Sequence, residues 1–220
     1  MPRKARIAPA GMVYHVLNRG NCRMEIFSKE GDYLAFIKLL EQGRQRAAMR
    51  VLAWCLMPNH WHLVLWPRRD GDLARFVGWI STTHVRRWRA HRSSDGEGHL
   101  YQGRYKSFIV ARDSHLRTVL RYVEQNPLRA GLVQRAEQWR WCSAAAEPEL
   151  ACDPWPVQRP RDWAARLNHP LPQQALERLR ASVKRGRPYG DEAWESRVVR
   201  RLGLEHTVRN PWRPKQKGGK

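Results

Sequence analysis

The spacing of apolar residues predicts alternating strands and helices over the first part of the chain. β-favouring runs at 13–17, 50–57, 60–66 and 105–111 have the length and composition of strands. Apolar residues recur at helical spacing over 32–45, over 72–89 and from about Asp113 onward. Pro58-Asn59 predicts a tight turn between the second and third strands. The predicted order of elements is therefore β-α-β-β-α-β-α.

This order indicates the α+β fold class. A split β-α-β unit used twice forms a ferredoxin-like antiparallel sheet, for which we expect helices on one face. The polar, glycine-containing stretch 93–98 is expected to be a loop.

The amino-acid composition of the sequence changes after about Trp141. Pro, Trp and Arg recur between Pro148 and Pro172, and helical patterns follow at 173–184 and 191–201. We therefore predict a domain at 1–145 and a basic, helical C-terminal extension at 146–220. The tail from Arg209 contains no acidic residue. It is either a solvated, disordered end or a basic segment that folds over DNA.

The charge of the chain points to a polyanionic partner. The 41 Lys and Arg residues exceed the 20 Asp and Glu residues, for a formal net charge of +21. Nucleic acid is the leading candidate. An anionic membrane surface is the alternative, but no apolar run approaches the roughly 18 residues of a membrane span, so no membrane partner is expected. The basic N-terminus lacks the apolar segment of a signal peptide, and we expect a cytoplasmic, nucleoid-associated protein.

Two residue types carry less specific signals. The four cysteines include no Cys-x-x-Cys pair, so zinc-finger spacing is absent. Several of the eleven tryptophans stand beside arginine, as in Arg87-Trp88-Arg89. Such tryptophans could stack on unpaired bases, or they could be core residues.

His60 and His62 flank Trp61 at the start of the third strand. Side chains alternate along a strand, so both imidazoles point to one side and Trp61 points to the other. The pair could supply two nitrogen ligands to one metal ion, or it could be an ordinary polar pair on the sheet.

Tyr122 and Asn126 are four residues apart, so in a continuous third helix they would share a face. A tyrosine hydroxyl can attack a phosphodiester when a divalent ion stabilises the developing charge. The amide oxygen of Asn126 is a reasonable third ligand for Mg²⁺ or Mn²⁺ beside two imidazoles. Alternatively, Asn126 caps a short helix that starts at Pro127, and Tyr122 is an ordinary half-buried tyrosine.

Four segments carry a resemblance to a known family. They are Tyr14-His15-Val16 with Asn18-Arg19-Gly20, Pro58-Asn59-His60-Trp61-His62-Leu63, Tyr101-Gln102-Gly103-Arg104-Tyr105-Lys106-Ser107, and the run from Tyr122-Val123-Glu124-Gln125-Asn126-Pro127 to Val133. Their order resembles the single-tyrosine HUH transposase superfamily. The Tyr-x-x-x-Asn spacing and the basic C-terminal extension most resemble its REP-associated tyrosine transposases. The resemblance covers residues 13–133.

The resemblance implies a fold, a site and a reaction. His60, His62 and Asn126 would hold Mg²⁺ or Mn²⁺, and Tyr122 would attack single-stranded DNA near hairpins of repetitive extragenic palindromes. The product would be a 5′-phosphotyrosine linkage and a free 3′-OH, which could later rejoin. Trp61 departs from the family pattern, in which the middle residue of the motif is usually a smaller aliphatic.

The basic residues near these elements are candidate DNA contacts. Arg104, Lys106 and Arg129 flank the predicted site, and Arg185 and Arg187 are predicted to grip the hairpin. The alternative for the first three is a solvated basic surface. Two other functions remain open: a nucleic-acid-binding protein without catalysis, and a metal-dependent hydrolase in which Tyr122 is incidental. The resemblance favours a monomer over a homodimer, and leaves open whether Tyr122 serves its own histidine pair or a partner's.

Overall fold

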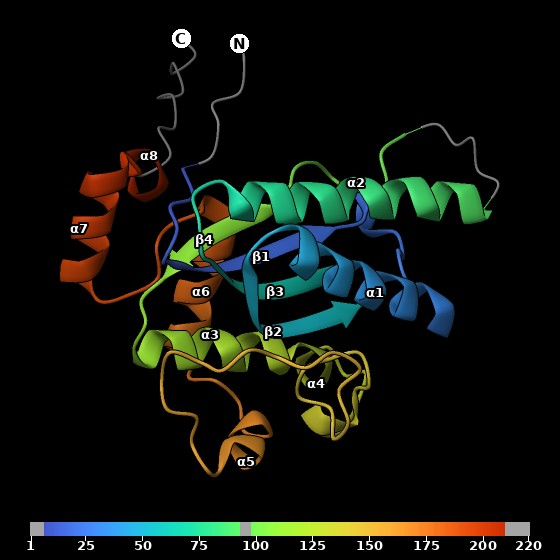
Figure 1. Cartoon of the computed structure of the whole chain (residues 1–220). Coiled ribbons are helices and arrows are strands. Elements are labelled where there is room, and N and C mark those ends of the chain that lie inside the picture. Colours follow the sequence, from blue (N-terminus) through green and yellow to red (C-terminus); the bar gives the residue numbers. More distant parts are fainter. Residues whose placement is uncertain (1–6, 93–97, 210–220) are drawn as a thin grey trace, which may run out of the picture.

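The computed structural model describes residues 7–92 and 98–209. Its four strands form one antiparallel sheet in the order β2-β3-β1-β4 (Figure 1). The strands are β1 (Val13–Arg19), β2 (Met49–Met57), β3 (His60–Pro67) and β4 (Lys106–Val110). The sheet and its connecting helices confirm the predicted α+β class with a β-α-β-β-α-β-α order.

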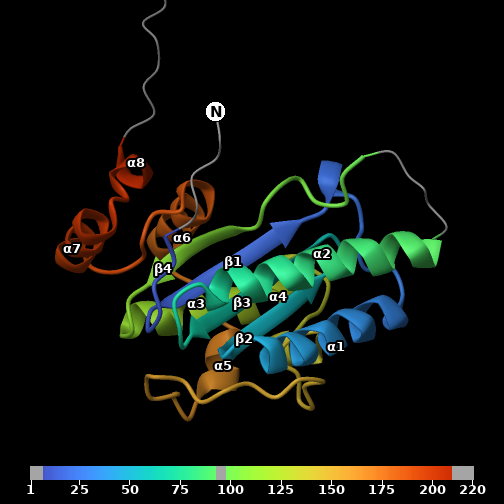
Figure 2. The same cartoon turned by 45° about the horizontal axis from the view of Figure 1, so that its top comes forward.

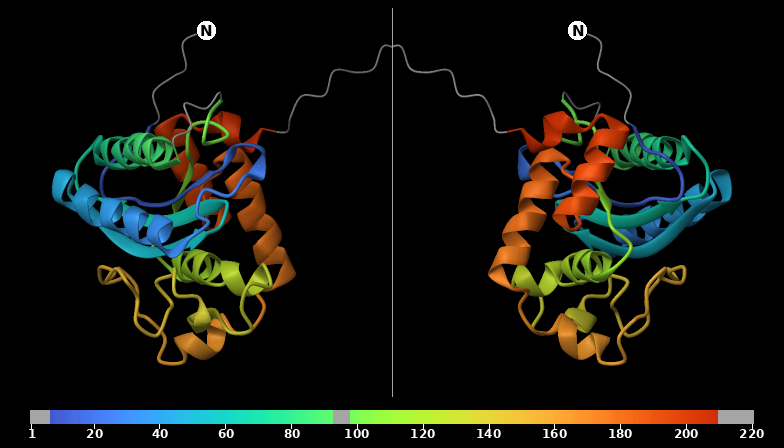
Figure 3. Two further views of the ribbon diagram at one scale, coloured as in Figure 1. Left: turned by 90° about the vertical axis from the view of Figure 1, so that its right-hand side faces the viewer. Right: turned by 90° about the vertical axis from the view of Figure 1, so that its left-hand side faces the viewer.

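Helices cover both faces of this sheet. The helices α1 (Glu30–Arg46) and α2 (Asp72–Arg92) pack together on one face, as predicted. The third helix, α3 (Ser114–Glu124), lies on the opposite face, against β2, β3 and β4 (Figures 1 and 3). The expectation that helices occupy one face therefore describes α1 and α2 but not α3.

The alternation of side chains along the strands explains this arrangement. In β3, Trp61, Leu63 and Leu65 belong to the apolar core beneath α1 and α2, whereas Val64 belongs to a second core beneath α3. Since both faces of the sheet are apolar, both must be covered, and α3 buries the second one. His62 shares the α3 side with Val64.

The longer C-terminal helices match the predicted ones, and of the short elements only the helix around Pro127 was considered from the sequence, as an alternative. The helices α6 (Gln173–Arg185) and α7 (Glu192–Leu202) follow the expected spacing. The others are two 3₁₀ turns and three helices of four or five residues: η1 (Asn21–Arg23), α4 (Asn126–Arg129), η2 (Ala136–Gln138), α5 (Trp163–Leu167) and α8 (Glu205–Val208). Elements this short span barely one turn and carry no apolar period.

The C-terminal part packs against the rest of the fold. Segment 141–153 runs along β2, where Ser143 N donates to Trp54 O at 2.9 Å and Asp153 N donates to Val51 O at 2.8 Å. Helix α5 contacts α3, and α6 contacts both α3 and β4. Figure 2 shows α6, α7 and α8 grouped beside β4. This packing places α6 at the β4 edge of the sheet and beside α3, the helix that carries Tyr122.

Three further expectations concern single segments. Trp54, Trp61 and Trp163 are buried, and Trp88 packs against the α1/α2 core. In the described parts of the chain, no helix is both long and apolar enough to cross a bilayer. The tail after Arg209 and nearly all of the predicted loop 93–98 lie outside the described residues.

Candidate active site

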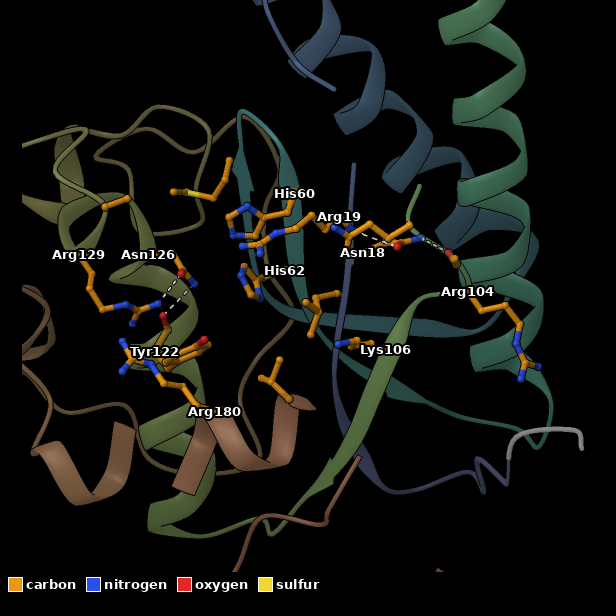
Figure 4. A pocket seen from close by; sticks show the side chains of 16 residues that line it. Asn18, Arg19, His60, His62, Arg104, Lys106, Tyr122, Asn126, Arg129 and Arg180 are labelled. Atoms are coloured by element: carbon orange, nitrogen blue, oxygen red, sulfur yellow. Dashed lines mark hydrogen bonds between the residues drawn. The ribbon is translucent and has the colours of Figure 1, made fainter. Parts of the chain in front are cut away.

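The predicted metal ligands and the predicted nucleophile line one cavity of about 540 Å³ (Figure 4). It lies between the sheet, the junction of α3 and α4, and α6. The side chains on it that can bind metal or phosphate, or attack, are His60, His62, Tyr122, Asn126, Arg19, Arg104, Lys106, Arg129 and Arg180. A histidine pair, a tyrosine and five cationic side chains thus meet in one place.

The two histidines are held in matching ways. His60 Nδ1 lies 2.6 Å from Asn59 Oδ1, and His62 Nδ1 lies 2.9 Å from His15 Nε2. The ring centroids of His60 and His62 are 4.9 Å apart. Because Nδ1 is used on each ring, Nε2 is the nitrogen left for a metal.

Burial keeps these rings neutral. It lowers the pKa of His60 to about 3, and the charges of Arg19 and Arg129 act in the same direction. Burial, together with His60 and His15, also lowers the pKa of His62 well below its usual value. A metal ligand must be a neutral imidazole, so at neutral pH both rings have the charge state that metal binding requires.

Tyr122 lies in the last turn of α3, next to the histidine pair. Its ring stands edge-on to the His62 ring, with centroids 5.9 Å apart and planes at 89°. The guanidinium carbon of Arg129 lies 4.3 Å from the centre of the Tyr122 ring. The predicted nucleophile and the histidine pair therefore come together within a single chain.

Asn126 begins α4 immediately after α3, and its side chain does not cap α4. The amide Nδ2 instead donates to the backbone oxygens of Tyr122, at 3.0 Å, and Val123, at 3.3 Å. These are terminal carbonyls of α3 that lack a partner within the helix. The amide is thereby fixed with Oδ1 turned to Arg129, which donates a hydrogen bond to it.

These donors fit a divalent ion. Among the described residues, no group of three or more His, Cys, Asp or Glu side chains could hold a metal. A site built on His60 and His62 must therefore take its third ligand from another residue type, and the amide oxygen of Asn126 is on the same cavity. Two imidazoles and one amide oxygen make a mixed nitrogen–oxygen set.

Trp61 is accommodated on the other side of the sheet. Its side chain is fully buried, and its indole Nε1 donates to the Tyr101 hydroxyl at 3.0 Å. That hydroxyl lies 2.6 Å from His84 Nδ1 on α2. Trp61, whose size departs from the family pattern, is thus part of a buried chain of hydrogen bonds behind the histidine pair.

The predicted DNA contacts divide into two groups. Arg104 and Lys106 line the site cavity and also an adjoining one of about 620 Å³, which Arg185 lines as well. Arg129 lies on the site cavity. Arg187 lines neither of these two cavities, and its guanidinium donates twice to the Glu195 carboxylate, at 3.0 and 2.7 Å.

Four residues at the site were not assigned a role from the sequence: His15, Arg19, Asn59 and Arg180. His15 and Arg19 do lie within the first segment that carries the family resemblance, and Asn59 adjoins His60. These positions in the sequence could have identified the three residues as candidates for the site. Arg180 stands on α6 among many other basic residues, and only its placement against the cavity distinguishes it.

Comparison with known proteins identifies the family of this chain. The family described as "Transposase IS200 like" matches residues 9–126, which is more than half of the chain. The chain belongs to this family. Its matched region contains all four strands, the histidine pair, Tyr122 and Asn126.

Three individual proteins that resemble this chain are distant from it in sequence. A protein of Haemophilus influenzae named "Putative REP-associated tyrosine transposase" is 24% identical over 121 residues, covering 51% of this chain and 69% of that protein. The predicted resemblance to that group is confirmed. A solved REP-associated tyrosine transposase bound to a REP hairpin shares the fold, with a TM-score of 0.52, 16% identity, and coverage of 65% of this chain and 82% of the other. A putative transposase from Deinococcus radiodurans has a TM-score of 0.39 and 20% identity, covering 56% and 96% of the two chains.

Proposed function

We propose that this protein cleaves and rejoins single-stranded DNA beside hairpins of repetitive extragenic palindromes, with Tyr122 as the nucleophile. The observation that carries the proposal is the meeting of Tyr122, His60, His62 and Asn126 on one basic cavity. Membership of a transposase family supports chemistry on DNA. The names of the Haemophilus influenzae relative and of the hairpin-bound structure support REP hairpins as the substrate.

The reaction is a transesterification. The Tyr122 oxygen forms a bond to phosphorus while the bond between phosphorus and the 3′ oxygen breaks. The phenol gives up a proton and the departing oxygen gains one, which leaves a 5′-phosphotyrosine linkage and a free 3′-OH. Attack by a 3′-OH on that linkage reverses the step. One phosphate ester replaces another each time, so no external energy source is required.

His60, His62 and Asn126 would hold the divalent ion, Mg²⁺ or Mn²⁺. When bound, the ion supplies positive charge that polarises the scissile phosphate. Arg129 contacts Asn126 and lies over the Tyr122 ring, so its positive charge stands beside the proposed nucleophile. Arg19, Arg104, Lys106 and Arg180 add positive charge around the place where a phosphodiester would lie.

The test is formation of a covalent protein–DNA adduct. Full-length protein is incubated with a labelled single-stranded REP hairpin and Mg²⁺ or Mn²⁺, and adducts are separated under denaturing conditions. Wild-type protein is expected to form the adduct only with the divalent ion, and Tyr122→Phe is expected to form none. Tyr189→Phe is the matched control, because Tyr189 does not line the cavity, and it should behave as wild type.

Other outcomes separate the alternatives. Cleavage without any adduct, unchanged in Tyr122→Phe, would mean a hydrolase in which Tyr122 is incidental. Hairpin binding without cleavage under either ion would mean a binding protein that lacks catalysis. Either result would contradict the proposal.

The proposed DNA contacts have a test of their own, in the salt dependence of hairpin affinity. Each lost phosphate contact lowers the slope of log affinity against log salt concentration by about 1. Lys106→Ala, on both cavities, is expected to show this change. Arg187→Ala is the comparison, since Arg187 was also predicted to contact the hairpin but lines neither cavity and is paired with Glu195. If the two cavities mark the DNA path, its slope should stay close to the wild-type slope, and an unchanged slope in Lys106→Ala would contradict that path.

A further inference from the structure

His15 lies directly behind His62, outside the cavity. It is a residue of β1, which pairs with β3 so that Leu17 stands opposite His62 and His15 stands opposite Val64. Its side chain has no exposed area, and its Nε2 lies 2.9 Å from His62 Nδ1. The two rings are nearly parallel, with planes at 18° and centroids 5.1 Å apart. A ligand in the cavity would therefore not touch His15, whose one side-chain hydrogen bond among the described residues runs to His62.

The hydrogen bond between the two rings can run in either direction, with opposite consequences. A neutral imidazole carries one proton. If His62 donates from Nδ1, its Nε2 has a free lone pair and can bind a cation. If His15 donates from Nε2, His62 Nε2 carries the proton and cannot. Metal binding at His62 therefore requires His15 to be the acceptor.

His60 makes a corresponding hydrogen bond through Nδ1, to Asn59, and the direction of this bond is fixed. The Asn59 amide Nδ2 donates to Arg23 O at 3.2 Å, which turns Asn59 Oδ1 toward His60 Nδ1. An amide oxygen can only accept, so His60 Nδ1 donates and its Nε2 is left unprotonated. Both histidines of the motif thus have an acceptor behind them, one from the 58–59 turn and one from β1.

Apart from His62, the rings that pack against His15 belong to two aromatic side chains, and among the described residues neither makes a hydrogen bond to it. The Phe108 ring lies 4.9 Å from it and the Tyr122 ring 6.0 Å. Its own Nδ1 is buried and has no hydrogen-bond partner among the described residues. As the acceptor from His62, His15 must carry its proton on this unpartnered nitrogen, which costs stability that an apolar residue here would not lose.

We propose that His15 is a positioning residue, which holds His62 in the Nδ1-protonated form and in the orientation that presents Nε2 to a divalent ion. This rests on the metal site of the proposed function. The loss of a group that supports a metal ligand typically weakens metal affinity by about 10–100-fold.

The experiment measures Mn²⁺ affinity by calorimetric titration of the full-length protein, without DNA. His15→Leu removes the acceptor and should weaken binding by about 10–100-fold. His15→Gln keeps an amide oxygen near the position of Nε2 and should stay within a few-fold of wild type. His62→Ala shows the Mn²⁺ affinity that remains when one ligand is lost. Wild-type affinity in His15→Leu would overturn the role of His15.

A second measurement reads the tautomer directly in the metal-free protein. Ring ¹⁵N shifts distinguish a protonated from an unprotonated nitrogen, and wild-type His62 is expected to be protonated at Nδ1. Protonation at Nε2 instead would overturn the proposal even if no variant folds. If wild type does not bind Mn²⁺ but His62 is protonated at Nδ1, the metal site of the proposed function fails while the arrangement of the two rings stands.

Discussion

Arg129 contacts both the predicted ligand Asn126 and the predicted nucleophile Tyr122. Its guanidinium and a divalent ion are both positive, and both would use Asn126 Oδ1. Arg129 therefore opposes metal binding by charge while it favours binding of a phosphate. We expect Arg129→Gln to raise Mn²⁺ affinity several-fold and to lower hairpin affinity and the rate of adduct formation.

Two opposite effects of one substitution distinguish this account from simple damage to the site. Arg180→Gln is the control, because Arg180 lines the same cavity while no contact joins it to Asn126 among the described residues. It should weaken hairpin binding and leave Mn²⁺ affinity close to wild type. A fall in Mn²⁺ affinity for Arg129→Gln would contradict the competition.

At the scale of residues, spacing along the sequence predicted which nearby residues share a face. It did not predict which residues of different strands meet. His60 with His62, and Tyr122 with Asn126, each lie within one element or across one turn, so their shared faces follow from the strand and helix periods. The bond from His15 to His62 depends instead on the register of β1 with β3. Strand periodicity does not determine which residues of two strands stand opposite each other.

At the scale of elements, the end of α3 is clamped to the C-terminal part of the chain through Glu124. Its buried carboxylate accepts hydrogen bonds from Ser143 Oγ and from Trp163 Nε1, both at 2.7 Å. Burial raises the pKa of Glu124. We expect Trp163→Phe to lower the free energy of unfolding by roughly 1.5–3 kcal/mol, the range for a hydrogen bond to a charged group. Denaturant unfolding measures it.

Trp155→Phe provides the matched control for this clamp. The two indoles pack edge to face with centroids 4.9 Å apart, and Trp155 Nε1 donates to the neutral backbone oxygen of Leu52. Its loss should cost roughly 0.5–1.5 kcal/mol. Equal losses in the two variants would mean that the charge of Glu124 contributes nothing.

The long elements and their order along the chain could be predicted from periodicity, whereas the role of the C-terminal extension could not. A hydrophobic stripe shows that α6 is a helix, but it does not show where the helix docks. The structure places α6 against β4 and α3, where it supplies Arg180 and Val183 to the site cavity. Removal of residues after Pro172 would therefore open the cavity as well as weaken DNA binding, so point substitutions test the extension more cleanly.

At the scale of the whole molecule, buried histidines make stability depend on pH. Burial lowers the pKa of His84 to about 3, and the pKa shifts of His15 and His60 have the same sign. Between the unfolded value near 6.5 and the folded value, only the unfolded chain binds the proton. The free energy of unfolding is thus expected to fall as pH decreases from about 6.5 toward 3, by at most about 1.4 kcal/mol per pH unit for each histidine.

His84→Asn isolates one of these contributions. His84 lies outside the site cavity, and an asparagine can still accept from the Tyr101 hydroxyl near the position of Nδ1. The variant is expected to lose stability less steeply on acidification than wild type, by up to about 1.4 kcal/mol per pH unit. Denaturant unfolding at a series of pH values provides the comparison, and identical slopes would show that His84 does not titrate on unfolding.

Because a single chain brings Tyr122 beside its own His60 and His62, one molecule holds the whole set of proposed catalytic side chains. We therefore expect the protein to act as a monomer, with each tyrosine serving its own histidine pair. Tyr122→Phe and His62→Ala are each expected to form no adduct, and a mixture of the two should form none either. In a dimer that shares its sites, random pairing would restore about a quarter of the wild-type sites. Adduct yield in the mixture, measured with the molecular mass in solution, decides between the arrangements, and recovery of that size would contradict the monomer.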